Sequence, residues 1–232
     1  MQNYELSPHG KSLIELYKIM VAEGYQKVDG SKTTETYNDF QLKKFRKLIL
    51  PKLSQINIQT VLDYGGGGSC WEAKCFDTET GCSAIEYFGL AEASVYEPAR
   101  GMIQKTPADA VVCIDVLEHI FVADIPNIVE ELFKLSKELL VINVACYEAA
   151  ALLPNGENAH VTIRSPDYWK GIIDAVAIKY PSVEVLLICS ETYDSGVIFE
   201  SFKASEWHAS KTYRIDPRVA GFTVKYQSPK TQ

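Results

Sequence analysis

A run of glycines directly after an apolar segment is the part of the sequence best suited to binding chemistry. Residues 60–64 are mostly apolar but include Asp63, and residues 65–68 are all glycine. Glycine lets a backbone turn sharply and lets a ligand approach it closely, because it has no Cβ. Ser69 and Glu72 have the spacing of a capping box, which predicts a helix that begins there. We therefore expect backbone N–H groups at a helix N-terminus, where a carboxylate or phosphate binds well.

The residues around the glycines discriminate between ligands. The dinucleotide fingerprint G-x-G-x-x-G would need glycine at position 70, where the chain has Cys70. Asp63 stands at the strand end, where it would repel a pyrophosphate and attract an ammonium group. S-adenosylmethionine (SAM) carries an ammonium, a carboxylate and a sulfonium cation. The segment therefore favours SAM over a nicotinamide dinucleotide.

The motif Asp63-x-Gly65-x-Gly67 resembles motif I of the class I SAM-dependent methyltransferases, with Ser69 where the family usually has a third glycine. Residues 93–98 resemble the second strand of that family, which ends in an acid, here Glu97. Residues 109–120 contain Asp-Val-Leu-Glu-His and resemble its fourth strand and the turn that follows. The resemblance implies SAM as methyl donor, S-adenosylhomocysteine as product, and Glu97 on the ribose hydroxyls. The cofactor-binding residues that it implies are Asp63, Gly65, Gly66, Gly67, Glu97, Asp115 and Val116.

Apolar runs alternate with amphipathic stretches after residue 60, which is typical of βαβ units with a parallel sheet. Two late apolar runs joined by a short polar link predict an antiparallel hairpin at the end of the sheet. The expected class is thus α/β, a Rossmann-like three-layer sandwich with a mostly parallel sheet. The expected strands are Thr60–Tyr64, Ala93–Tyr96, Ala110–Ile114, Leu139–Val144, Val183–Cys189 and Gly196–Lys203.

Helices are predicted on both sides of the glycine run. Two come first, one after Ser7-Pro8 and one from about Asn38 that ends or kinks at Pro51. The later ones begin near Cys70, at Ile125 (to Leu135) and at Ser165. Only a loop fits between Glu97 and Asp109, so the third strand region of the family is shortened. Asp109, or backbone near Met102 and Ile103, could replace the missing acid that contacts adenine.

Three segments follow from this pattern. Residues 1–57 form an N-terminal helical segment over the substrate side, and residues 58–208 form the SAM-binding domain. Residues 209–232 form a tail without a clear pattern.

The long segment from residue 145 to residue 160 supplies the candidate acceptor-side residues, since functional residues concentrate on such loops. His160 is the candidate general base, because its ordinary pKa suits proton transfer near neutrality. Tyr147, Glu157 and Asn158 could orient an acceptor. The alternative is a loop held together by its own hydrogen bonds. His119 either faces the substrate or is a structural histidine within its turn.

Composition narrows the function further. The 232 residues carry a net charge of −7, which disfavours a phosphate backbone or an anionic membrane as partner. Motifs typical of DNA methylation are absent from the sequence, so the expected acceptor is a small molecule. No apolar run approaches the roughly 18–20 residues that span a bilayer, and no signal-peptide pattern begins the chain.

The six cysteines show no C-x-x-C spacing, which indicates free thiols in a reducing, cytoplasmic setting. The gaps between Cys70, Cys75 and Cys82 fit no usual zinc spacing, so we expect no metal site. Two other functions stay open. The chain could be a SAM-using enzyme that does not transfer methyl, or a non-catalytic, methyltransferase-like subunit that binds a partner.

Overall fold

The central sheet forms where apolar residues run together in the sequence. The computed structural model describes residues 4–34, 38–199 and 201–209, and the predicted tail 209–232 lies outside these ranges except for residue 209. The strands of the main sheet are β3 (Thr60–Tyr64), β4 (Glu92–Tyr96), β5 (Ala108–Ile114), β6 (Ser136–Ala145), β7 (Glu184–Ser190), β8 (Gly196–Ile198) and β9 (Phe202–Lys203).

The order across this sheet is β4-β3-β5-β6-β7-β8, with β9 also paired to β7. The pairs from β4 to β7 are parallel, whereas β8 and β9 both run antiparallel to β7. The predicted terminal hairpin is therefore confirmed, although its second arm is divided into two short strands. The Rossmann-like α/β class is confirmed as well.

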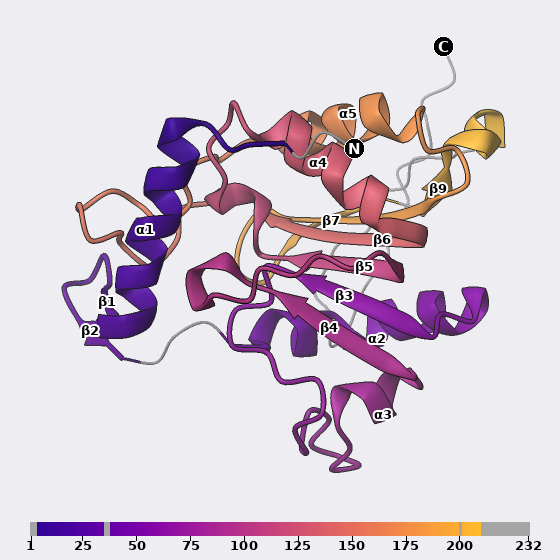
Figure 1. Cartoon of the computed structure of the whole chain (residues 1–232), viewed down its shortest axis with the longest axis horizontal. Helices are drawn as coiled ribbons and strands as arrows, with labels where there is room; N and C mark the ends of the chain where they lie inside the picture. The colour runs from indigo at the N-terminus through magenta and orange to yellow at the C-terminus, as the bar shows by residue number, and fades with distance from the viewer. Residues whose placement is uncertain (1–3, 35–37, 200, 210–232) are drawn as a thin grey trace.

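Helices cover both faces of the sheet and complete three layers. α4 (Ile125–Leu135) and α5 (Pro166–Ala177) lie on one side, and α2 (Phe40–Ile56) and α3 (Ala84–Phe88) on the other (Figure 1). Side chains of a strand alternate between faces. Along β3, Leu62 therefore packs in the core under α4 and α5, whereas Val61 packs in the core under α2 and α3.

The strand order creates a switch point between β3 and β5. From β3 the chain passes to β4 on one side, and it then returns to β5 on the other side of β3. In open α/β sheets the crevice for a ligand lies at the carboxyl ends of the strands at such a point. The residues after β3, β4 and β5 therefore come together at one edge of the sheet.

The connection from β4 to β5 contains only the short 3-10 helix η1 (Pro98–Arg100). Neither a helix nor a strand follows before β5, within this fully described stretch. The predicted shortening of the third strand region is thus confirmed.

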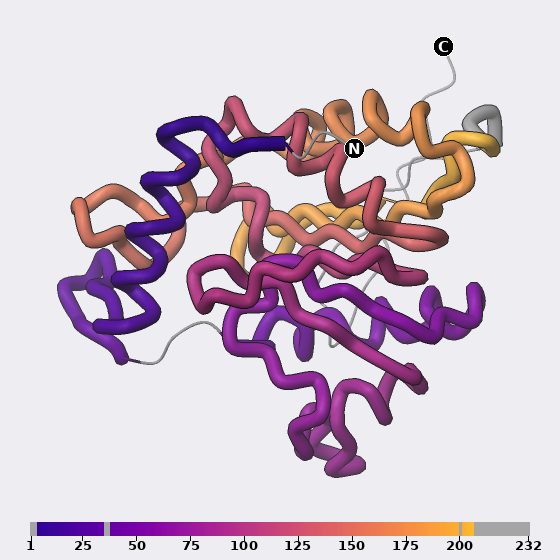
Figure 2. The backbone as a smooth tube through the Cα atoms, in the orientation of Figure 1, coloured from indigo at the N-terminus to yellow at the C-terminus, as the bar shows by residue number. Residues whose placement is uncertain are grey.

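α1 (Pro8–Glu23) begins as predicted, because the Ser7 hydroxyl accepts a hydrogen bond from the Gly10 amide at 3.0 Å. The helix lies beside the segment that follows β6, and the small hairpin of β1 (Tyr25–Gln26) and β2 (Lys32–Thr33) lies near its end (Figure 2). The apolar contacts between α1 and this segment involve Leu13, Met20, Ala149, Leu153 and Ala159.

A buried carboxylate fixes the start of α1 against the start of α4. Asp124 accepts hydrogen bonds from the Tyr4 hydroxyl, from the Ser7 amide at 3.0 Å and from the Ser7 hydroxyl at 2.8 Å. A Cβ at Gly10 would come within 2.2 Å of an Asp124 oxygen, so only glycine permits this close approach. The position of α1 therefore depends on one side chain that is far away in the sequence.

One predicted helix start is wrong, and one of the two alternatives given for Pro51 is excluded. No helix begins at Ser69 or Cys70: residues 70–82 form successive turns, and the capping box is made by Ser83 and Glu86 at the start of α3. α2 does not end at Pro51 but continues to Ile56, because Ile49 and Leu53 on either side of the proline are both buried against the sheet. None of the helices in the described part of the chain combines the length and apolar character needed to cross a bilayer.

Candidate functional site

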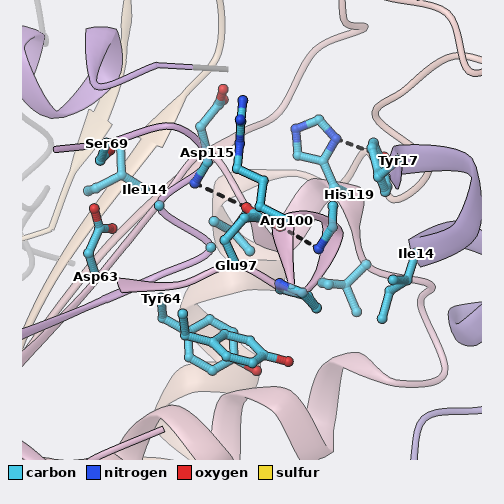
Figure 3. A pocket seen from close by; sticks show the side chains of 18 of the residues that line it. Ile14, Tyr17, Asp63, Tyr64, Ser69, Glu97, Arg100, Ile114, Asp115 and His119 are labelled. Atoms are coloured by element: carbon cyan, nitrogen blue, oxygen red, sulfur yellow. Dashed lines mark hydrogen bonds between the residues drawn. The ribbon is translucent and has the colours of Figure 1, made fainter. Parts of the chain in front are cut away.

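A cavity of about 290 Å³ opens at the carboxyl ends of β3, β4 and β5 (Figure 3). This is near the lower end of the range for ligand pockets. All seven predicted cofactor-binding residues line the cavity, together with His119. Its other walls come from α1 and from the start of α2.

The glycine loop leaves no room for side chains. Gly65 has a φ of 77°, and its amide donates a hydrogen bond to the Tyr96 carbonyl at 2.7 Å. A Cβ at Gly65 would lie 2.6 Å from Val116 Cγ2, and a Cβ at Gly66 would lie 2.5 Å from Asp63 Oδ2. The loop is therefore a tight backbone turn packed between two predicted site residues.

The loop does not present a helix N-terminus, contrary to the sequence prediction. Local polar contacts hold residues 70–82 in turns instead. Asp77 accepts hydrogen bonds from the Thr80 amide and hydroxyl, and Arg46 of α2 also binds Asp77. Such side-chain bonds compete with helix formation. The expected dipole at the loop is absent, and any ligand would meet the glycine backbone and the flanking acids.

Asp63 is buried at the end of β3, with 4% of its surface exposed. Its Oδ2 accepts a hydrogen bond from the Trp71 indole nitrogen at 2.9 Å. Burial raises the pKa of Asp63 to about 6, although the hydrogen bonds from Trp71 and Ser69 act in the opposite direction. A buried carboxylate with a raised pKa gains from a cation placed beside it.

Glu97 follows β4 and reaches the glycine loop. Its Oε2 accepts a hydrogen bond from the Gly67 amide at 3.0 Å, and its Oε1 accepts one from the Ala99 amide at 2.9 Å. A carboxylate has about four acceptor sites, so two bonds leave capacity for ligand hydroxyl groups. Glu97 thereby joins the loop after β3 to the turn after β4.

At the end of β5, Asp115 has a left-handed backbone, with a φ of 61°. Its amide donates to the Asn143 carbonyl at 3.1 Å. Glu118 is fully buried on the next turn; its Oε1 accepts from the Ala145 amide, and its Oε2 has no partner among the described residues. Burial, followed by the charge of Asp115, raises the pKa of Glu118 well above its ordinary value.

His119 lines the cavity, and hydrogen bonds at its Nδ1 fix the position of its ring. Its Nδ1 lies 2.9 Å from the Ala159 carbonyl oxygen and 2.9 Å from the Tyr17 hydroxyl, which donates to the same carbonyl (Figure 3). Burial, followed by the neighbouring His160, lowers the pKa of His119 to about 4. The ring is therefore neutral at physiological pH and is a weak proton acceptor.

The other predicted acceptor-side residues lie behind His119. The His160 ring packs edge-on against His119 with centroids 4.8 Å apart, and Tyr147 packs against His160. Asn158 binds within its own loop, since its Oδ1 accepts from the Ala149 and His160 amides. Glu157 is exposed and accepts a hydrogen bond from the Asn155 side chain.

Asp109 does not reach the cavity. It binds the Gln59 and Thr60 amides at the amino end of β3, at distances of 3.2 and 3.0 Å. Asp109 therefore stands at the opposite end of the strands from the glycine loop. The suggestion that Asp109 contacts adenine is wrong for this reason.

Several cavity residues were missed from the sequence. Ile14 and Tyr17 of α1 face the cavity, and Gln41 comes from the start of α2. The Gln41 Oε1 is buried without a hydrogen-bond donor among the described residues. Nothing local marks these positions, because their place depends on how the N-terminal helices dock on the sheet.

Comparisons with protein-family models, with curated proteins and with solved structures find no match for the chain. The fold itself defines the class of the protein. It is a Rossmann-like α/β sandwich with a cavity at the switch point of its sheet.

The tightness of the glycine loop gives a first testable prediction. Gly66→Ala would push a methyl group against Asp63, so we expect a loss of about 1–3 kcal/mol in the free energy of unfolding. Gly171→Ala, in the open interior of α5, is the matched control and should increase stability by up to about 1 kcal/mol. Urea unfolding measures both, and equal stability of the two variants would contradict the packing described for the loop.

Proposed function

We propose that the chain is a SAM-dependent methyltransferase that acts on a small-molecule acceptor. The observation that carries this proposal is the meeting of a buried acid, a glycine loop and a second acid around one cavity at the switch point of the sheet. Asp63 and Gly66 belong to one segment and Glu97 to another, about 30 positions later, and both segments contribute to the same cavity.

The residues of the cavity fit the groups that SAM carries. Asp63 would receive the ammonium, because a buried carboxylate is stabilised by a neighbouring cation. Glu97 would receive the ribose hydroxyls, since both of its oxygens keep acceptor capacity. The Gln41 Oε1, which has no hydrogen-bond partner among the described residues, would accept a hydrogen bond from a donor such as an amino group.

SAM supplies an already activated methyl group, so the chain mainly has to position donor and acceptor and exclude water. α1 would help to exclude water, because Leu13 and Ile14 give the cavity an apolar wall. His119 is the acceptor-side residue that reaches the cavity. His160 and Tyr147 would act through it rather than on the acceptor directly.

A small acceptor in a reducing compartment fits the remaining features. The net charge of −7 disfavours a polyanionic substrate. All six cysteines are free thiols, which agrees with a cytoplasmic setting.

Calorimetry with SAM and S-adenosylhomocysteine tests the proposal. We expect both to bind the wild-type protein, and Glu97→Ala to weaken binding about 10- to 100-fold, because hydrogen bonds to a charged group are lost. Glu72→Ala, an exposed acid near the loop, is the control and should bind as the wild type does. A screen of small metabolites with methyl-labelled SAM then identifies the acceptor. A folded wild-type protein that binds neither compound would refute the proposal.

A further inference from the structure

Two imidazole rings and a carboxylate meet at the wall of the cavity. Asp115, His119 and His160 each offer one ligand atom, and these atoms all lie within 4.8 Å of one another. Ligand atoms bound about 2.1 Å from one ion are roughly 3 to 4 Å apart, so small side-chain movements would close this set around an ion. Two of the residues follow β5 directly, whereas His160 comes from the segment after β6.

A buried carboxylate oxygen beside this set lacks a partner. Glu118 is fully buried, and its Oε2 meets no hydrogen-bond donor among the described residues. A buried polar atom without a hydrogen bond is costly. A cation bound by Asp115 would offset this cost, and this is independent of the geometry of the three ligands.

Each of the two histidines has a backbone carbonyl beside its Nδ1. Nδ1 of His119 lies 2.9 Å from the Ala159 carbonyl, and Nδ1 of His160 lies 2.5 Å from the Tyr147 carbonyl. A carbonyl oxygen only accepts, so each Nδ1 is placed to donate, and Nε2 is the ring nitrogen that would bind a metal. A backbone carbonyl behind a histidine is the usual second-shell support of a metal ligand.

The backbone of Asp115 adds a further sign of a specialised position. A residue with a side chain rarely adopts a φ of 61°, and such strain clusters at functional sites. The conformation turns the chain at the end of β5, where it brings Asp115 to the histidines.

We propose that Asp115, His119 and His160 bind one divalent transition-metal ion at the cavity wall. Two nitrogen ligands favour an ion such as Zn²⁺ or Co²⁺ over Mg²⁺, which prefers oxygen ligands. Three protein ligands leave a coordination position for water or another oxygen. If the proposed function holds, on which this extension rests, that position would receive an oxygen of the methyl acceptor.

Titration of the full chain with Co²⁺ tests the site, because the visible absorption of Co²⁺ changes when nitrogen ligands bind it. We expect one equivalent to bind the wild-type protein and to raise its melting temperature. Asp115→Asn should weaken Co²⁺ binding more than about 100-fold, since even second-shell losses cost about 10- to 100-fold. This variant should fold, because asparagine tolerates the left-handed backbone. His160→Asn should show the same loss.

His9→Gln is the matched control, since His9 lies on the exposed side of α1 and packs on Phe121 rather than in the cluster. Absence of saturable Co²⁺ binding by the folded wild-type protein would overturn the proposal. Equal affinity of Asp115→Asn and His9→Gln would do the same, and a preference for Mg²⁺ would overturn the assigned class of ion. The titration contains no SAM, so its failure and a failure of cofactor binding are separate results.

Discussion

Asp63→Asn is expected to weaken SAM binding about 10- to 100-fold at pH 7 while making the free protein more stable. The pKa of the buried Asp63 is raised to about 6, so above that pH its charge destabilises the folded state. The folded state holds its proton more firmly than the unfolded chain, so stability falls as the pH rises from about 4 to about 6. Asparagine removes this cost of roughly 1–3 kcal/mol and can still accept the Trp71 hydrogen bond.

The pH dependence of binding separates this mechanism from a general disturbance of the loop. Wild-type affinity for SAM should fall by up to tenfold for each pH unit below 6, because protonated Asp63 cannot attract the ammonium. Asp63→Asn should show a flat profile. Asp174→Asn, on α5, is the control and should keep the wild-type profile. Calorimetry from pH 5 to pH 8 measures all three, and parallel slopes for wild type and Asp63→Asn would exclude the ammonium role.

Asp124→Ala is expected to lower the free energy of unfolding by about 2–4 kcal/mol and to release α1 from the cavity. The substitution removes the acceptor of the Tyr4 hydroxyl and of the Ser7 amide and hydroxyl. Because α1 forms one wall of the cavity, SAM affinity should fall together with stability.

Hydrogen exchange identifies the element that is released. In Asp124→Ala, the α1 amides should exchange much faster, while the β5 and β6 amides keep most of their protection. Asp124→Asn retains an acceptor oxygen and should lose less stability than the alanine variant. Unchanged exchange in α1 would show that its apolar contacts hold it without Asp124.

The sheet could be predicted from the sequence because its signals are local. Apolar runs such as Thr60–Tyr64 and capping residues such as Ser165 act within a few positions. The meeting of Asp63, Glu97 and Asp115 in one cavity also followed, because the carboxyl ends of neighbouring parallel strands share one edge.

What could not be predicted depends on contacts between distant segments. Turns replace the helix predicted after Ser69, and they include Asp77, which binds Arg46 of α2 31 positions away in the sequence. The wall formed by α1 depends on Asp124, 117 positions after Ser7. No motif of closely spaced residues predicts such contacts.

The cluster of Asp115, His119 and His160 could not be predicted for the same reason. The cysteine spacing predicts no metal site, and it carries no information about aspartate and histidine ligands. Asp115 and His119 are four positions apart, which is a usable signal, but His160 joins them only through the docking of the segment after β6.

The short connection after β4 has a consequence for solubility. In the described part of the chain β4 pairs with β3 alone, so it is an edge strand. Exposed edges can pair with other chains and start aggregation. Here the strand has five residues, begins at the charged Glu92 and is followed within two positions by Pro98, which has no amide hydrogen. The charge at the start of this edge and the proline after it therefore limit how far a second copy could pair with it.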